Sequence, residues 1–110
     1  MSVTEKSKKV FLKTYIDYAP GSVVSKTMLE EKCGTITLFA FDKGTELSEH
    51  TAPFDAMVQV IDGKSLITIA GREFELEEGD IIIMPADIPH AVKAKGPFKM
   101  LLTMIRKKTS

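Results

Sequence analysis

Two histidines, His50 and His90, are the only imidazoles in the chain. Each lies near a proline in the sequence. Pro53 follows His50 closely, and Pro89 immediately precedes His90. An imidazole can ligate a transition metal, act as a general base near neutral pH, or exchange hydrogen bonds with a bound molecule. These two residues are therefore the first candidates for any chemistry that the protein performs.

Two interpretations of the histidines are open. Taken singly, each imidazole is most simply a partly buried side chain that is hydrogen-bonded to a carboxylate or a carbonyl group. Taken together, the two could point from adjacent strands into one apolar cavity, and such a convergence of titratable groups is typical of a binding site. We expect the second arrangement, with or without a metal between the rings.

The elements that must position these residues are predicted to be short strands. Turn-forming residues recur at fairly even intervals, for example at Pro20-Gly21, Asp62-Gly63, Ala70-Gly71 and Lys95-Gly96-Pro97. The segments between the turns are rich in β-branched and aromatic residues, and turns about 8–12 residues apart are typical of an all-β sandwich or barrel. The sequence therefore predicts an antiparallel barrel or double-sheet roll, whose mouth is a common place for a small ligand.

Several segments carry more specific predictions. Residues 72–80 (REFELEEGD) alternate between apolar and acidic side chains, which predicts a half-buried strand with one wet face. Residues 80–84 (DIIIM) are apolar on both faces, as expected of a strand between two packed layers. Asp62-Gly63 separates two apolar runs, which is the strongest short-range signal for a β-hairpin. Residues 7–19 (SKKVFLKTYIDYA) fit either a short helix or an edge strand.

Length and composition limit the classes of protein. A chain of 110 residues forms one domain with one modest core. Fifteen basic residues balance fifteen acidic ones, and the basic runs KSKK and RKK lie near the two ends, so we expect no nucleic-acid partner. No segment approaches the ~20 apolar residues of a membrane span or resembles a signal peptide, so no membrane partner is expected. Cys33 is the only cysteine, which favours a reducing, cytoplasmic location.

The spacing of glycines, prolines and histidines resembles the two motifs of the cupin family. The first motif is matched by Gly44, His50 and Gly63, and the second by Gly79, Pro85 and His90. The resemblance covers about residues 22–106 and implies an antiparallel double-stranded β-helix, the jelly-roll barrel of cupins. Residues 1–21 would then be an N-terminal segment that serves as an edge element or is swapped between copies, and residues 107–110 a polar tail.

Four positions depart from the family pattern. Ala52 stands where the family has a second histidine and Ala56 where it has a glutamate, while Asp87 and Ala94 replace a glycine and an asparagine of the second motif. Of the four metal ligands that the resemblance implies, only the two histidines remain. Catalytic zinc and non-haem iron sites usually have three protein ligands, so the sequence predicts a degenerate site for a divalent transition metal.

Two carboxylates are candidates for a third metal ligand. Asp55 is adjacent to the vacated glutamate position, but neighbouring side chains of a strand point to opposite faces unless a β-bulge re-aims one of them. Glu46 lies close to His50 in the sequence, in a predicted loop. Either carboxylate could complete a metal site only if the backbone turned it toward the imidazoles.

The barrel register also predicts the lining of the cavity. Besides the two histidines, the predicted lining residues are Ala52, Ala56, Val58, Val60, Met84 and Met100. We expect this cavity to bind a small organic molecule, sugar-like or a carboxylate, with the imidazoles as polar anchors. The alternative is an enzyme, for which the resemblance implies metal-dependent isomerase, lyase or dioxygenase chemistry, or a histidine acting as a general base.

Two further expectations concern assembly. A non-catalytic interaction module is a third possibility, since the resemblance implies that barrels of this kind also serve as dimerising or sensory domains. The resemblance and the apolar last strand, residues 98–105 (FKMLLTMI), together predict a homodimer.

Overall fold

Eight antiparallel strands follow one short helix in the part of the chain, residues 3–107, that the computed structural model describes. They are α1 (Leu12–Tyr15), β1 (Val23–Glu31), β2 (Gly34–Phe41), β3 (Glu46–His50), β4 (Phe54–Ile69), β5 (Arg72–Glu77), β6 (Ile81–Met84), β7 (His90–Lys93) and β8 (Phe98–Arg106). The predicted all-β double-stranded β-helix is thus confirmed. Most of the predicted polar tail, residues 108–110, lies outside the described residues, as do residues 1–2.

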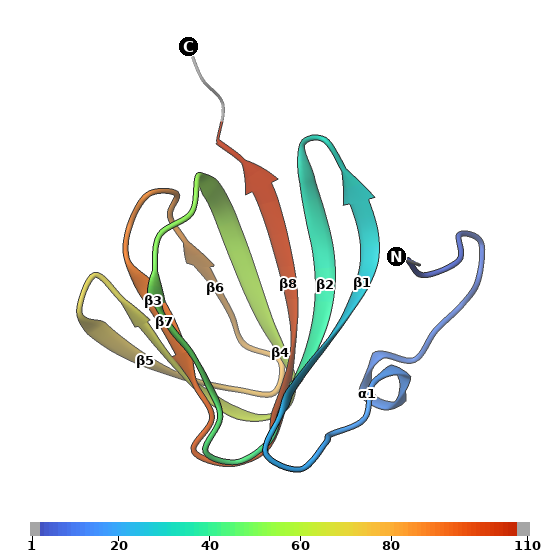
Figure 1. Cartoon of the computed structure of the whole chain (residues 1–110), viewed down its shortest axis with the longest axis horizontal. Helices are drawn as coiled ribbons and strands as arrows, with labels where there is room; N and C mark the ends of the chain where they lie inside the picture. The colour runs from blue at the N-terminus through green and yellow to red at the C-terminus, as the bar shows by residue number, and fades with distance from the viewer. Residues whose placement is uncertain (1–2, 108–110) are drawn as a thin grey trace.

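The strands form two sheets that share β4. The first sheet has the order β1-β2-β8-β4-β6, and the second has the order β5-β4-β7-β3. Figure 1 shows the two sheets curling toward each other, meeting at the bottom of the view and opening at the top. Phe41 and Phe98 are fully buried and stack with 4.5 Å between their ring centroids, so the core is closed at the end away from this opening.

The predicted hairpin at Asp62-Gly63 is wrong, because β4 continues through these residues as one long bent strand. A hairpin turn of this kind needs positive φ at both central residues, and of these two only Gly63 has it, at 74°. The pairing of β4 with β8 instead shifts by one residue between Val60 and Asp62, and such a bulge bends a strand. The tight hairpin lies at Ala70-Gly71, where both φ angles are positive, at 51° and 80°.

Two other strand predictions had opposite outcomes. The alternation predicted for residues 72–80 is confirmed, since Leu76 is buried and the glutamates of β5 are exposed. The prediction that residues 80–84 lie between two layers is wrong, because β6 is an edge strand paired only with β4. Met84 faces the core, whereas Ile81 and Ile83 are 55% and 59% exposed. The identical isoleucines of this strand therefore have different environments, which their residue type could not reveal.

The N-terminal segment packs against the outer face of the first sheet, as Figure 1 shows. Of the two predicted alternatives, the short helix is the one that forms, over Leu12–Tyr15. Ile16, which follows the helix, is buried against Leu38 and Ala40 of β2. The segment thus covers part of a sheet face that would otherwise expose apolar side chains to water.

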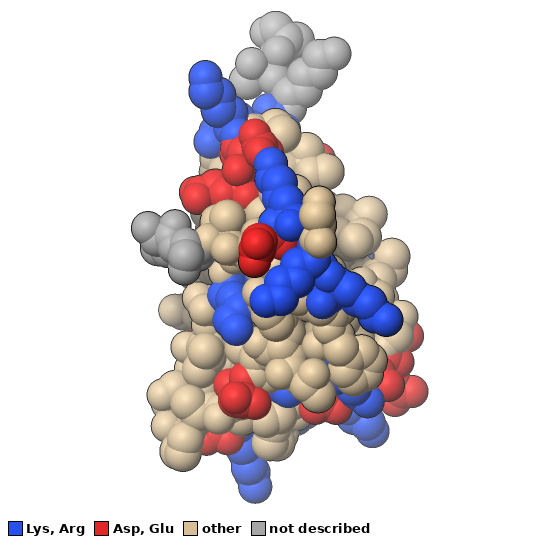
Figure 2. Space-filling view, turned by 90° about the vertical axis from the view of Figure 1, so that its right-hand side faces the viewer, with Lys and Arg blue, Asp and Glu red and all other residues tan. Residues whose placement is uncertain are grey.

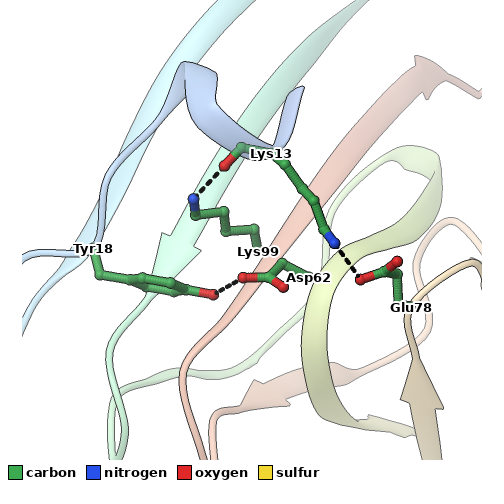
Figure 3. Close-up of polar contacts among 5 residues, drawn as sticks. All are labelled: Lys13, Tyr18, Asp62, Glu78 and Lys99. Carbon is green, nitrogen blue, oxygen red and sulfur yellow. Dashed lines mark hydrogen bonds and ion pairs between the residues drawn. The ribbon is translucent and has the colours of Figure 1, made fainter. Parts of the chain in front are cut away.

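A polar cluster, called the N-terminal clamp below, fastens this segment to the barrel (Figure 3). Lys99 is almost fully buried, donates a hydrogen bond to the carbonyl oxygen of Lys13, and places Nζ 4.9 Å from the centroid of the Tyr18 ring. The Tyr18 hydroxyl donates to Asp62 at 2.8 Å, and Lys13 pairs with Glu78 at 2.9 Å. Burial and the Asp62 carboxylate raise the pKa of Tyr18 above its usual value, so the hydroxyl keeps the proton that it donates.

Charged side chains of both signs lie on the face that Figure 2 shows. Lys and Arg side chains gather across the middle of this face, and Asp and Glu side chains lie above and below them. Within residues 3–107, no helix is long and apolar enough to cross a bilayer.

Candidate ligand-binding site

His50 ends β3, His90 begins β7, and the two residues lie opposite each other in this antiparallel strand pair. Their ring centroids are 4.4 Å apart, and their planes meet at 69°, which is an edge-to-face arrangement. Directly opposed side chains on one face of a sheet are close enough to interact. The structure thus brings the two candidate residues together as a cross-strand pair.

A bulge in β3 turns His50 toward the interior. Between the pairs Leu47–Val92 and His50–His90, β3 advances three residues while β7 advances two. Strict alternation would place Leu47 and His50 on opposite faces, and one extra residue restores them to the same face. The position of His50 therefore depends on an irregularity that the sequence pattern alone does not reveal.

Both imidazoles are held by backbone carbonyl groups two residues earlier in the chain. Nδ1 of His50 lies 2.7 Å from the carbonyl oxygen of Ser48, and Nδ1 of His90 lies 3.2 Å from that of Ile88. A carbonyl oxygen only accepts hydrogen bonds, so Nδ1 is the protonated nitrogen in each ring. In the neutral imidazoles, each Nε2 atom then keeps a lone pair that these contacts do not use.

The two imidazoles differ in their surroundings. His90 is buried, with 6% of its surface exposed, whereas His50 is exposed. Burial lowers the pKa of His90, and the neighbouring His50 lowers it further, while the hydrogen bond to Ile88 opposes these two effects. His90 is therefore mainly neutral at pH 7, with its Nε2 atom as a hydrogen-bond acceptor.

A cavity of about 40 Å³ lies beside the histidine pair. Apart from the two imidazoles its lining is apolar, and the residues that border it are Leu47, His50, Ala52, Phe54, Ala56, Met84, His90, Val92, Met100, Leu102 and Met104. Pockets for drug-sized ligands measure about 300–1,000 Å³. This cup therefore suits a compact molecule, and its flexible methionines can adjust to the ligand's shape.

Six of the eight predicted lining residues border this cavity, and the exceptions are Val58 and Val60. Both valines are buried deeper in the core, farther along β4 than Ala56. The prediction missed Leu47, Phe54, Val92, Leu102 and Met104. Two of these could have been found, because Leu102 and Met104 share the face of Met100 in an alternating strand.

The structure brings neither candidate carboxylate to the imidazoles. Asp55 is exposed and accepts a hydrogen bond from the backbone N–H of Ala86 at 2.9 Å. Glu46 is exposed and faces Lys93 across the strand pair, with 4.0 Å between their charged atoms. Within residues 3–107, no three His, Cys, Asp or Glu side chains gather into a possible metal site. The donor set that these residues offer is thus two imidazoles, fewer than the three protein ligands usual for a catalytic metal.

Asp87, which stands where the second motif has a glycine, connects two loops at the rim of the cup. This residue adopts a φ of 64°, a left-handed conformation that aspartate tolerates better than most residues. Its backbone N–H donates to the carbonyl oxygen of Ala52 at 2.8 Å, and its carboxylate pairs with Lys107 at 2.9 Å. The loop before His90 is thereby joined to the loop after His50.

Comparisons with known proteins agree with this architecture. The family model described as Cupin domain matches residues 37–105. A conserved protein of unknown function from Streptococcus pyogenes is 35% identical, with a TM-score of 0.90 over 99% of this chain and 98% of that one. A cupin superfamily protein from Desulfitobacterium hafniense is 25% identical, with a TM-score of 0.88 over 96% and 97% of the two chains.

A third structure, a cupin 2 conserved barrel domain protein from Leptotrichia buccalis, is 37% identical with a TM-score of 0.80, over 83% of this chain and 44% of that one. No curated protein matches the sequence. The family match spans most of the chain and contains both histidine motifs, on the strands and loops that build the cup. The chain therefore belongs to the cupin family.

Proposed function

We propose that this cupin binds a compact organic acid in the cup beside His50 and His90. The carboxylate would lie at the imidazoles and the apolar part of the ligand against the methionines. The observation that supports this proposal is the convergence of two imidazoles in an otherwise apolar cup, each with Nδ1 already bonded to a backbone carbonyl. The two Nε2 atoms are left to anchor a ligand.

The size and lining of the cup favour a compact acid over a sugar. A sugar carries several hydroxyl groups, and each one buried without a hydrogen-bond partner costs about 1–3 kcal/mol. The cup offers two side-chain nitrogens and about 40 Å³ of space. A short acid presents one polar group and an apolar remainder, which is the distribution that this lining matches.

Binding of a carboxylate must be coupled to uptake of a proton. A neutral imidazole with Nδ1 engaged offers only a lone pair at Nε2, and a carboxylate also only accepts hydrogen bonds. One imidazole must therefore become protonated, after which its Nε2–H forms a charge-assisted hydrogen bond with the carboxylate. Because the pKa of the empty His90 is lowered, we expect affinity to increase as the pH falls from 8 to 6.

Calorimetric titration with acetate, propionate and butyrate at pH 6, 7 and 8 tests this proposal. We expect tighter binding at lower pH and a net proton uptake, seen as a heat that depends on the ionisation enthalpy of the buffer. Glycerol, a small polyol, should bind more weakly than propionate. His90→Gln should abolish the pH dependence, whereas Glu73→Gln on the exposed face of β5 should not. Affinity that is constant or increases with pH would contradict the proposal.

The alternative, an enzyme that depends on a metal or on histidine, has one observation in its favour. Histidines that bind metals usually donate their other ring N–H to a backbone carbonyl or a carboxylate, and both imidazoles make such a contact. Elemental analysis of the purified protein distinguishes the two functions. We expect substoichiometric, easily removed metal, whereas one tightly held iron, manganese, nickel or zinc ion per chain would favour the enzyme.

A further inference from the structure

The inward-facing side chains of β8 end in a cation. The members of this series that are buried or border the cup are, in order, Phe98, Met100, Leu102 and Met104. Arg106 is the next residue of the alternation, and the pairing of β8 with β4 is regular up to this point, so Arg106 belongs to the same face of the strand. Figure 1 shows that β8 ends at the open side of the barrel. The row that lines the cup therefore ends, at the mouth, in a guanidinium group.

Arg106 lies over an aromatic ring that also lines the cup. Phe54 is its direct partner in the pairing of β4 with β8, and Phe54 borders the cavity. The guanidinium carbon of Arg106 is 4.8 Å from the centroid of the Phe54 ring. A guanidinium group at this distance is attracted by the face of the ring. One aromatic ring thus adjoins both the cavity and the cation.

The charged neighbours of Arg106 already have partners. Lys107 pairs with Asp87 at 2.9 Å, so these two charges neutralise each other. Asp55 borders a hollow on the outer face of the first sheet and accepts a hydrogen bond from a backbone N–H group. Among residues 3–107, no aspartate or glutamate forms an ion pair with Arg106. The N–H donors of its exposed guanidinium group are therefore available to an anion.

Arg106 and the imidazoles stand on different walls of the cup. His50 and His90 belong to β3 and β7 of the second sheet, whereas Arg106 belongs to β8 of the first. The cavity is lined by apolar side chains of both sheets, such as Val92 of β7 and Leu102 of β8. Groups that can bind anions thus flank the apolar cup on two sides.

We propose that Arg106 is a specificity-determining residue that selects an acid with a second carboxylate, so that the ligand of the cup is a short dicarboxylate. This inference rests on the proposed binding of a carboxylate at the imidazoles. A second carboxylate placed against the methionines would be an unpaired charge in apolar surroundings, which is strongly unfavourable. At the mouth it would instead accept two parallel hydrogen bonds from the guanidinium group, the geometry that arginine offers to carboxylates.

Calorimetric titration with succinate and butyrate at pH 7 tests the proposal. These two acids have chains of equal length and differ only in the carboxylate or methyl group at one end. We expect the wild-type chain to bind succinate about 10-fold more tightly than butyrate, and this preference to decrease at high salt. Succinamate, in which a neutral amide replaces the second carboxylate, should bind more weakly than succinate.

Three variants separate Arg106 from the rest of the molecule. Arg106→Gln should reduce the affinity for succinate to about that for butyrate, while the affinity for butyrate stays unchanged. Arg106→Lys keeps the charge but loses the planar fork, so it should retain only part of the preference. Arg72→Gln is the matched control and should keep the full preference. Arg72 also lies over an aromatic ring, 5.4 Å from the centroid of Phe74, but this ring does not border the cup.

Three results would overturn the assignment of Arg106 while leaving the carboxylate site at the imidazoles intact. The first is equal affinity of the wild-type chain for succinate and butyrate. The second is a preference for succinate that persists in Arg106→Gln. The third is a loss of both affinities by the same factor in that variant, because Arg106 would then only support the Phe54 ring. The absence of binding of either acid would contradict the proposed function itself, and with it the dicarboxylate.

Discussion

The N-terminal clamp and the histidine pair each contain one buried polar side chain, Lys99 and His90 respectively, but they differ in how fully their polar side chains are bonded. In the clamp, Lys99, Tyr18 and Lys13 each have a partner within the cluster. In the cup, His50 and His90 each use one nitrogen on the backbone and keep the other. The clamp is complete without a ligand, whereas the cup has unused hydrogen-bonding capacity.

This difference separates a structural polar cluster from one suited to binding. A buried polar group that has a partner contributes to stability, and removing the partner leaves an unsatisfied group that costs about 1–3 kcal/mol. Substitutions in the clamp should therefore lower the free energy of unfolding. Substitutions in the cup should change ligand binding while stability changes little.

The largest effect is expected at Gly63, in the bend of β4 beside the clamp residue Asp62. A methyl group there would collide with the carbonyl oxygen of Pro97, and φ at this position is 74°. We expect Gly63→Ala to lower the free energy of unfolding by about 3 kcal/mol or more, measured by urea denaturation. Gly71→Ala is the matched control, because φ is 80° there but no atom lies within 4 Å of the added methyl group. Equal losses in the two variants would show that the close contact with Pro97 is unimportant.

The clamp should be most sensitive at Lys99, which joins the N-terminal segment to β8. Lys99→Ala removes the hydrogen bond to the Lys13 carbonyl, the contact with the Tyr18 ring, and the packing of the aliphatic stem. We expect a loss of about 2 kcal/mol together with faster hydrogen exchange in residues 12–18. Lys99→Met keeps the stem and should lose less. Unchanged exchange in residues 12–18 of Lys99→Ala would mean that apolar packing alone holds the segment.

A smaller loss is expected when one hydrogen bond of the clamp is removed. Tyr18→Phe deletes the hydroxyl that donates to Asp62 at 2.8 Å, and we expect a loss of about 1 kcal/mol. A double-mutant cycle with Asp62→Asn isolates the interaction between the two side chains. A coupling energy near zero would show that the pair contributes nothing beyond its separate contacts with the surroundings.

The histidine pair should have the smallest effect on stability. We expect His50→Gln and His90→Gln each to change the free energy of unfolding by less than about 1 kcal/mol at pH 7, while the affinity for the ligand at pH 6 decreases. A loss comparable to that of Lys99→Ala in either variant would instead indicate a structural role for the imidazole.

The pH dependence of stability gives a finer test of the same residue. The pKa of His90 is lower in the folded protein than in the unfolded chain, so the unfolded chain binds more protons as the pH falls below about 6.5. Stability should therefore decrease from pH 7 to pH 5, and the decrease should be smaller in His90→Gln. Identical pH profiles for the two proteins would contradict the burial of a neutral His90.

The features predicted correctly from the sequence depend on local patterns or on motif spacing. Alternation defines β5, and the glycine, proline and histidine spacing identifies the cupin barrel. The errors at Asp62-Gly63 and at residues 80–84 arose because these patterns have more than one tertiary outcome. A glycine with positive φ can bend a strand as well as end it, and an apolar strand can lie at an edge. The ligand, the homodimer and the cytoplasmic location stay predictions.

By itself, the sequence determined the all-β class, the family, and the two imidazoles as the polar residues of the cup. Only the tertiary structure decided how those imidazoles meet, because a bulge in β3 sets the direction of His50 and burial sets the charge of His90. The same holds for the volume of the cup. Strand patterns specify which residues share a face, whereas depth, bulges and coverage depend on how distant segments pack.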